Sequence, residues 1–539
     1  LSAHKPDTFH EALQLVWLIH IAFLYEKRFA MALGRLDQYL YPFYLEDVSR
    51  GRLTRERATQ LVECTLYKIV ETKRFNEHLI NLGADDVVNI AIGGVTRDGS
   101  DATNELSYII LEAVKNCNIP GPNLSARMHR DTPEEFWDKC LNVIGTGLGY
   151  PALMNDEINI PALARYGYDI EDCRDYCMVG CIENFMPGKQ PAWSDGRFNS
   201  PKYLELALNN GICMLTGAQL GPMTGEPSDF KTMDDYLVAV KKQMEFGAAE
   251  YVALFRNDND RYNRQIYSQP FLSCFCNDCI ERGLDICDGG AIYPSVHGAA
   301  CMGIATVADS LAATEKLVFI DKKLSLSQLR DILASNFEDH EEIQRELKAL
   351  PKYGNNDDFV DKYARMYVDI HAEIFSIYRT RDGGGIYIGI ASNISNIGAG
   401  KEVAATADGR RNGMPLSDAA SPMHGCDKNG VTSVVNSSSK PDFRQVACGT
   451  VLNQKFSPGM FASQEKRDKI KSLIQVYFEK GGQEMQINAV SREMLKDATK
   501  YPEKYSDLVV RVSGFSAYFT KLDSTVQQDV LARTEHANV

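Results

Sequence analysis

Apolar residues recur every three or four positions through long parts of the chain, which is the period of an amphipathic helix. Near the start, Leu13, Val16 and Leu24 share one helical face, and Thr8 with Glu11 has the spacing of a capping box. The same period predicts helices over residues 104–117, 233–255, 306–320, 357–378 and 464–479, and in a segment that opens at Thr132 and Pro133.

Shorter apolar runs lie between these helices. Residues 87–92, 484–490 and 508–512 are predicted strands. Because helical and extended segments alternate, the expected fold class is α/β, with parallel strands buried by helices. The chain has no internal repeat and no linker rich in Pro, Gly or Ser, which favours one large domain.

Two stretches break this alternation. Residues 176–199 are rich in Gly, Pro and Cys and have no helical period, and residues 386–417 carry several glycines with few apolar runs. Irregular segments inside a compact fold are often functional loops. These stretches are therefore the first places to look for a functional site.

Composition and charge narrow the class of protein. The 539 residues are 44% hydrophobic and 24% charged, which excludes a disordered or collagenous chain. Lys and Arg number 58 and Asp and Glu 72, and the net charge of −14 argues against a nucleic-acid partner and against adhesion to an anionic membrane. The most apolar run, residues 15–24, is too short to span a bilayer, and no secretory signal is recognised. We therefore expect a cytoplasmic protein.

The fourteen cysteines are too dilute for a disulfide scaffold, so reduced thiols are expected. Cys173, Cys177 and Cys181 are spaced four apart and could supply three thiolates to an iron–sulfur cluster. The usual radical S-adenosylmethionine spacing differs from this one, and on a helix the three would form one buried stripe. An iron–sulfur protein stays open as an alternative, but no metal site is expected.

Cys181 is followed by Ile182, Glu183 and then a Pro-Gly loop. Side chains two apart in an extended segment point the same way. The pair would place a thiol, which can carry a hydrogen atom, beside a carboxylate that can act as an acid or a base. Taken alone, the pattern is weak, because it is usually no more than a buried cysteine beside a surface glutamate.

Near the C-terminus, residues 511–519 read Arg-Val-Ser-Gly-Phe-Ser-Ala-Tyr-Phe and place Gly514 directly after a predicted strand. Such a glycine predicts a turn or a close backbone approach. The run closely resembles the signature of the glycyl radical enzymes, and Gly-Cys-Ile-Glu at 180–183 resembles the cysteine loop of the same family. Further matching stretches span nearly the whole chain at residues 34–39, 92–94, 121–125, 278–283, 308–311 and 408–411.

The resemblance implies a fold, a ten-stranded α/β barrel in which the cysteine loop and the glycine loop meet at the centre. Residues 1–415 would form the pyruvate formate-lyase-like barrel domain and residues 416–539 the glycine radical domain. Known members carry a long N-terminal region. Because this chain opens at Leu1, within eight residues of a helical pattern, we expect that region to be missing and the barrel to be incomplete at its N-terminus. A homodimer is also expected.

The resemblance also implies a mechanism. A separate radical S-adenosylmethionine activating enzyme would install a radical on Gly514, and no bound cofactor would be needed. Glycine suits this role because a planar radical carbon tolerates no side chain. The radical would pass to Cys181, the sulfur radical would take hydrogen from a small substrate, and Glu183 would act as the base.

Gly180 stands where the acetyl-transferring pyruvate formate-lyases carry a second cysteine. The Cys-x-Glu form resembles the eliminating and decarboxylating branches instead. We therefore expect a glycyl radical lyase that acts on a small hydroxylated substrate, with dehydration as the leading reaction. The alternatives are a formate C-acetyltransferase-like enzyme, a decarboxylating enzyme and a catalytically silent truncated paralogue.

Three residues are candidates for substrate binding. Asp195, preceded by Trp and Ser, resembles the Asp of glycerol and propanediol dehydratases that binds a substrate hydroxyl. Phe29 replaces part of a polar pair in those dehydratases, and Val87 aligns with a pocket position that is often aromatic. His297 lies in a segment that departs from the family pattern and is either a specificity residue or a core histidine.

Overall fold

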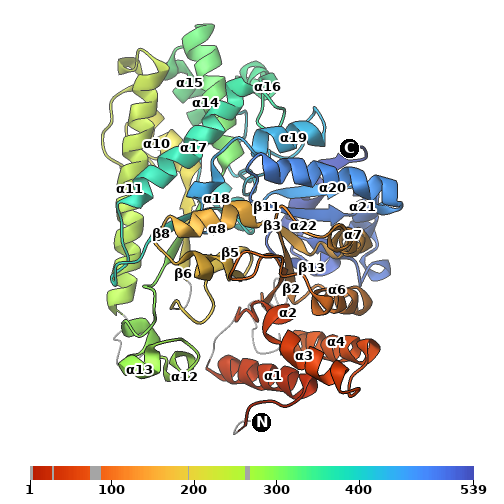
Figure 1. Cartoon of the computed structure of the whole chain (residues 1–539). Helices are drawn as coiled ribbons and strands as arrows, with labels where there is room; N and C mark the ends of the chain where they lie inside the picture. The colour runs from red at the N-terminus through yellow and green to blue at the C-terminus, as the bar shows by residue number, and fades with distance from the viewer. Residues whose placement is uncertain (1–3, 27–29, 73–86, 192–193, 262–267) are drawn as a thin grey trace. The chain divides into compact units, whose positions relative to one another are not determined.

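The computed structural model describes the chain except residues 1–3, 27–29, 73–86, 192–193 and 262–267 (Figure 1). The described chain divides into two compact units. The first unit comprises residues 1–191, 269–293 and 453–539, and the second comprises residues 192–268 and 294–452. Each unit is therefore built from segments that lie far apart in the sequence.

Among the described residues, the first unit holds one sheet of six strands, which in sheet order are β1 (Asn89–Gly93), β2 (Asn123–Met128), β3 (Ala152–Asn155), β11 (Glu484–Ala489), β10 (Asn453–Phe456) and β14 (Glu535–His536). β1, β2 and β3 run parallel, β11 is antiparallel to β3, and β10 and β14 are parallel to β11. Every residue of β1, β2, β3, β10 and β11 is buried, as expected for a sheet covered on both faces.

Two short hairpins accompany this sheet. The first pairs β4 (Cys177–Val179) with β5 (Glu183–Phe185), and the second pairs β12 (Val509–Arg511) with β13 (Ser516–Tyr518). The first hairpin falls in the segment predicted to be irregular. The second falls at the predicted strand near the C-terminus, and the two hairpins carry the site described below.

The α-helices of the first unit begin close to the residues that the pattern predicts. Thr8 caps α1 by accepting from the Glu11 amide at 3.2 Å, but the Glu11 carboxylate accepts from Asp7, so the capping box is only half formed. The helices described in this unit are α1 (Phe9–Tyr25), α2 (Leu36–Tyr39), α3 (Tyr41–Ser49), α4 (Arg55–Glu71), α6 (Glu105–Cys117), α7 (Glu134–Val143), α8 (Asp156–Ala164), α9 (Ile170–Arg174), α12 (Pro270–Ser273), α13 (Cys279–Arg282), α20 (Gln464–Glu479), α21 (Arg492–Lys500) and α22 (Ser524–Ala532).

The second unit contains a parallel sheet whose described strands, in sheet order, are β6 (Ser194–Asn199), β7 (His297–Met302), β8 (Ile386–Ile390) and β9 (Gly449–Thr450). Its described helices are α10 (Ser200–Leu208), α11 (Met233–Arg261), α14 (Ile304–Thr314), α15 (Leu326–Ala334), α16 (Glu341–Ala349), α17 (Asp358–Ser376), α18 (Ser395–Lys401) and α19 (Val431–Ser438). Helices follow strands along the chain, which is the arrangement that gives parallel pairing.

The predicted strands and long helices are confirmed within a few residues of their ends. The helix predicted to open at Thr132 and Pro133 begins at Glu134. Thr132 was expected to cap it, but the Thr132 hydroxyl accepts from the His129 amide at 2.8 Å instead. Within the described residues, no helix is both long enough and apolar enough to cross a membrane. The domain boundary after residue 415 stays a prediction.

Candidate active site

Cys181 lies at the tip of the β4–β5 hairpin. Val179 pairs with Glu183 across the hairpin, and Gly180 opens the turn with a φ of +62°, a conformation that glycine adopts without strain. Glu183 folds back over the turn, where its Oε2 accepts from the amides of Cys181 at 2.8 Å and Ile182 at 2.9 Å. The Cys181–Glu183 segment is therefore a tight turn and not the extended segment that the sequence predicted.

Polar side chains from two strands of the large sheet hold this turn in place. The side-chain amide of Asn89 donates to the backbone carbonyls of Gly180 and Cys181, both at 3.3 Å, and the side-chain amide of Asn123 donates to the carbonyl of Gly180 at 3.2 Å. The Ser125 hydroxyl donates to the Asn89 carbonyl at 3.1 Å and so fixes the orientation of that amide. The position of Cys181 is thus set by side chains at the N-terminal ends of β1 and β2.

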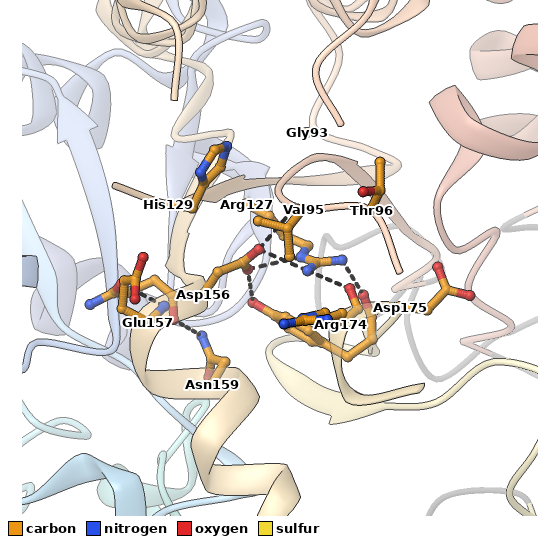
Figure 2. Close-up of polar contacts among 12 residues, drawn as sticks. Gly93, Val95, Thr96, Arg127, His129, Asp156, Glu157, Asn159, Arg174 and Asp175 are labelled. Atoms are coloured by element: carbon orange, nitrogen blue, oxygen red, sulfur yellow. Dashed lines mark hydrogen bonds and ion pairs between the residues drawn. The ribbon is translucent and has the colours of Figure 1, made fainter. Parts of the chain in front are cut away.

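A buried ion pair anchors the chain that leads into the hairpin (Figure 2). Arg127, on β2, donates from Nε and Nη2 to both oxygens of Asp156, at 2.9 and 2.8 Å. The same guanidinium donates to the carbonyl of Arg174 at 2.7 Å and to that of Tyr176 at 2.9 Å, and it lies 4.0 Å from the centre of the Tyr176 ring. The Tyr176 hydroxyl closes the cluster by donating to Asp156 at 2.8 Å.

Both members of this ion pair are almost completely removed from solvent, with 0% and 2% of the Arg127 and Asp156 side chains exposed. Burial alone would lower the pKa of Arg127, but the facing carboxylate of Asp156 more than compensates and the pKa is raised. Arg127 therefore stays charged, and its five donors can hold two backbone carbonyls as well as the carboxylate.

Gly514 lies in the turn between β12 and β13 and is in direct contact with Cys181. Its φ is +84°, and a Cβ added to it would lie 2.7 Å from the Cys181 sulfur and still closer to the Cys181 Cβ. An alanine therefore does not fit at this position, for reasons of both backbone conformation and space. The hydrogen that occupies the Cβ direction points at the thiol, which is the arrangement needed to pass a hydrogen atom between them.

The Gly514 turn is fixed by buried polar residues on β11. The backbone N–H of Gly514 donates to the side-chain oxygen of Gln486 at 2.9 Å. The Asn488 side chain accepts from the backbone N–H of Arg511 and donates to the backbone carbonyl of Arg511, both at 2.7 Å. The Arg511 guanidinium donates to neutral partners, Gln486 and Asn123. Burial lowers the pKa of Arg511 to about 10, with the Glu484 carboxylate acting in the opposite direction, so the side chain remains cationic at neutral pH.

The structure thus brings Cys181, Glu183 and Gly514 together in the first unit. Sequence reasoning missed Asn123, Gln486 and Asn488. A signal was present for the last two, because alternate polar residues in a predicted buried strand require polar partners.

The metal alternative is not supported by the geometry. Cys173 lies in α9, Cys177 in β4 and Cys181 in the turn, so the three do not share a helix. Within the described parts of the chain, no group of three or more His, Cys, Asp or Glu side chains could hold a metal ion. Burial raises the pKa of Cys173 and of Cys177 to about 12, as expected for inert core thiols.

The candidate substrate-binding residues that the structure describes belong to different units. Val87 is half-buried and precedes β1 in the first unit, and Phe29 lies outside the described residues. Asp195 is the second residue of β6 in the second unit and forms an ion pair with Arg197. His297, in the same unit, is buried, with hydrogen bonds to the hydroxyls of Ser194 at 2.9 Å and Tyr251 at 2.8 Å. These contacts favour a core histidine.

Comparison with known families agrees with this geometry. Residues 1–400 match the family described as pyruvate formate lyase-like, and residues 416–520 match the glycine radical family. The chain belongs to the pyruvate formate lyase-like glycyl radical enzymes.

Relatives include the (2S)-3-sulfopropanediol dehydratase of Klebsiella oxytoca, 34% identical over 98% of this chain and 65% of the relative. The trans-4-hydroxy-L-proline dehydratase of Clostridioides difficile is 35% identical over 99% of this chain and 68% of the relative. Among solved structures, the glycerol-bound B12-independent glycerol dehydratase from Clostridium butyricum matches with a TM-score of 0.95 at 37% identity, over 99% of this chain and 68% of that one.

These likenesses confirm the α/β fold of the glycyl radical enzyme type, while the number of ten barrel strands stays a prediction. The chain spans 65% of the length of the sulfopropanediol dehydratase.

Proposed function

We propose that this chain carries the catalytic centre of a glycyl radical lyase, which eliminates a leaving group, in the first instance water, from a small hydroxylated substrate. The observation that carries the proposal is the contact between Gly514 and the Cys181 thiol, with Glu183 folded over the same turn. A hydrogen-atom carrier and an acid–base group within one turn are what a radical elimination requires.

The proposed cycle begins with a radical on Gly514, installed by a radical S-adenosylmethionine activating enzyme. The Gly514 radical takes the hydrogen of the Cys181 thiol, which restores the glycine and leaves a sulfur radical. The sulfur radical takes a hydrogen from a substrate carbon that bears a hydroxyl, which restores the thiol and leaves a carbon radical. Hydrogen transfer costs no separation of charge, so a neutral, partly buried thiol suits the step.

Glu183 then takes the proton of that hydroxyl, and the electron density released expels the leaving group from the neighbouring carbon. When the leaving group is hydroxide, it departs as water with the proton that Glu183 received. The product radical takes the hydrogen back from Cys181, and the sulfur radical recovers its hydrogen from Gly514. All atoms and electrons balance, and the radical is available for the next cycle.

The names of the relatives support elimination as the reaction class. The sulfopropanediol, hydroxyproline and glycerol dehydratases are all named for loss of water from a hydroxylated compound. Within this proposal, Asp195 and Val87 are substrate-binding residues, residues 416–539 form the glycine radical domain, and the enzyme is a cytoplasmic homodimer that binds its activating enzyme.

The test is anaerobic incubation of the protein with a radical S-adenosylmethionine activating enzyme and S-adenosylmethionine, followed by electron paramagnetic resonance. A doublet is expected from the protein and from Cys181→Ala, and none from Gly514→Ala. Glycerol, propane-1,2-diol, trans-4-hydroxy-L-proline, isethionate and 3-sulfopropanediol are then supplied and products are followed by NMR. A doublet that survives Gly514→Ala, or turnover by Cys181→Ala, would contradict the mechanism. No doublet from the unaltered protein would favour the catalytically silent paralogue.

A further inference from the structure

One buried side chain, Asn123, bonds both loops of the candidate active site. Its amide nitrogen donates one hydrogen to the carbonyl of Gly514 at 2.8 Å and the other to the carbonyl of Gly180 at 3.2 Å. Gly180 directly precedes Cys181 in the chain. The carbonyl of Gly514 and the carbonyl of the residue before Cys181 therefore accept hydrogen bonds from the same nitrogen.

The orientation of the Asn123 amide is fixed from its other end. Its carbonyl accepts from Nη1 of Arg511 at 3.0 Å, and because a guanidinium only donates, the oxygen must face Arg511 and the nitrogen must face the two loops. The positive charge also polarises the amide and strengthens the bonds that its nitrogen donates. Asn123 is 4% exposed and Arg511 1%, so water does not compete for these bonds.

The same guanidinium reaches the other end of Gly514. Nε of Arg511 donates to the side-chain oxygen of Gln486 at 2.7 Å, and the same oxygen accepts from the backbone N–H of Gly514 at 2.9 Å. The contacts form a closed ring from Arg511 through Asn123 to the Gly514 carbonyl, and from the Gly514 amide through Gln486 back to Arg511. Both backbone polar groups of Gly514 are therefore tied to strands β2 and β11.

We propose that Asn123 is a positioning residue for hydrogen transfer, which holds the Gly514 Cα at a fixed distance from the Cys181 sulfur while the radical moves between them. Transfer between two heavy atoms is steeply sensitive to their separation, and a misplacement of about 1 Å can cost on the order of a hundredfold in rate. Asn123 acts through the hydrogen bonds that its side chain donates to the backbone carbonyls of Gly180 and Gly514. The inference rests on the proposed function and deepens it.

The test compares Asn123→Asp with Asn155→Asp. The first replacement keeps the shape and the contact with Arg511 but removes both hydrogens donated to the loops. The second makes the same change at a buried asparagine of the first unit whose side-chain nitrogen also donates to two backbone carbonyls, those of Phe478 at 3.1 Å and Gly482 at 2.6 Å. A second variant, Asn123→Ser, introduces an uncharged hydroxyl on a shorter side chain, whose single hydrogen cannot bond both loops. It is used if the buried carboxylate of Asn123→Asp prevents folding.

Each variant is activated anaerobically, its spins are counted by electron paramagnetic resonance, and turnover is expressed per spin on a substrate that the unaltered protein converts. We expect both Asn123 variants to carry a doublet, to lose about a hundredfold in kcat per spin and to keep KM unchanged. Asn155→Asp should keep kcat per spin within a fewfold.

Equal turnover per spin in the Asn123 variants and the unaltered protein would overturn the inference. So would an equal loss in Asn155→Asp, or a folded Asn123 variant that forms no doublet, because Asn123 would then serve the fold or activation and not the transfer. Failure of the proposed function has a different signature, since the unaltered protein itself would then show no doublet or convert no substrate.

Discussion

The Cα of Gly514 lies so close to the side chain of Cys181 that position 514 has no room for one more carbon atom. An added Cβ would be 2.7 Å from the Cys181 sulfur, whereas ordinary van der Waals contact begins at 3.4 Å. The contact joins the ends of two hairpins that are separated by more than three hundred residues of sequence. It leaves glycine as the residue that fits, independently of any radical chemistry.

This contact predicts that Gly514→Ala destabilises the fold as well as abolishing the radical. The new methyl group would meet Cys181, and the φ of +84° would be strained for a residue with a side chain. We expect a loss of roughly 2–4 kcal/mol in the free energy of unfolding, measured in urea under anaerobic, reducing conditions.

Gly167→Ala is the matched control for the backbone strain. Gly167 has a φ of +82°, and an added Cβ would meet nothing within 4 Å. It should cost about 1–2 kcal/mol, the strain alone. In the double variant Cys181→Gly with Gly514→Ala, the clash is removed and part of the loss should return. Equal losses for Gly514→Ala and Gly167→Ala would show that the predicted crowding is absent.

The sequence contained enough to locate the three central residues but not the groups that position them. Cys181, Glu183 and Gly514 stand in short patterns that can be recognised without a fold. Asn123 and Gln486 do not, because their role arises only when β2 and β11 lie in one sheet and both hairpins reach it. Helices and strands were predictable because their periods are local, whereas hydrogen bonds across hundreds of residues are not.

Glu183 illustrates the limit at short range. Its spacing from Cys181 suggested two side chains on the same side of an extended segment. The positive φ of Gly180 instead turns the chain, and the carboxylate caps the amides of Cys181 and Ile182. Side chains two residues apart lie on the same side only where the backbone is extended, and a glycine such as Gly180 permits a turn there instead.

The buried pair of Arg127 and Asp156 yields a stability prediction. Arg127→Met would leave the Asp156 carboxylate buried without this cation and would remove the hydrogen bonds that Arg127 donates to the carbonyls of Arg174 and Tyr176. We expect a loss of about 3–5 kcal/mol in the free energy of unfolding, measured by urea denaturation.

A nearby surface pair supplies the control. Arg130 is exposed and lies 4.0 Å from Glu157, so Arg130→Met should change the free energy of unfolding by less than about 1 kcal/mol. Replacing both buried partners, as Arg127→Met with Asp156→Leu, should recover part of the loss because no unpaired charge remains. A double variant less stable than Arg127→Met would refute this explanation.

His297 predicts how stability depends on pH. Burial lowers the pKa of His297 from 6.5 to about 4, so the folded protein keeps this ring neutral while the unfolded chain binds a proton below pH 6.5. The unfolded state therefore binds more protons in this window, and the stability contributed above pH 6.5 is lost as the pH falls towards 4.

The measurement is urea denaturation of the unaltered protein and His297→Gln between pH 7 and pH 4. Glutamine can still bond Ser194 and Tyr251 but does not titrate. The stability difference between the two should change by roughly 3 kcal/mol over this range, in favour of the variant at low pH. Some acid sensitivity should persist, because burial also lowers the pKa of His20 and His371 to about 4. Parallel curves for the two proteins would contradict the prediction.

Glu183→Gln separates the structural role of this residue from its proposed chemical role. A glutamine carbonyl can accept from the amides of Cys181 and Ile182, as the carboxylate does at 2.8 and 2.9 Å, so the turn should keep its shape. It cannot take a proton from a substrate hydroxyl. We therefore expect a normal spin count and a fall in kcat on the order of 10²–10⁴-fold. Glu183→Ala, which also removes the turn contacts, should lower the spin count or the stability as well. Near-normal turnover by Glu183→Gln would assign the base to another residue and leave Glu183 as a support for the Cys181 turn.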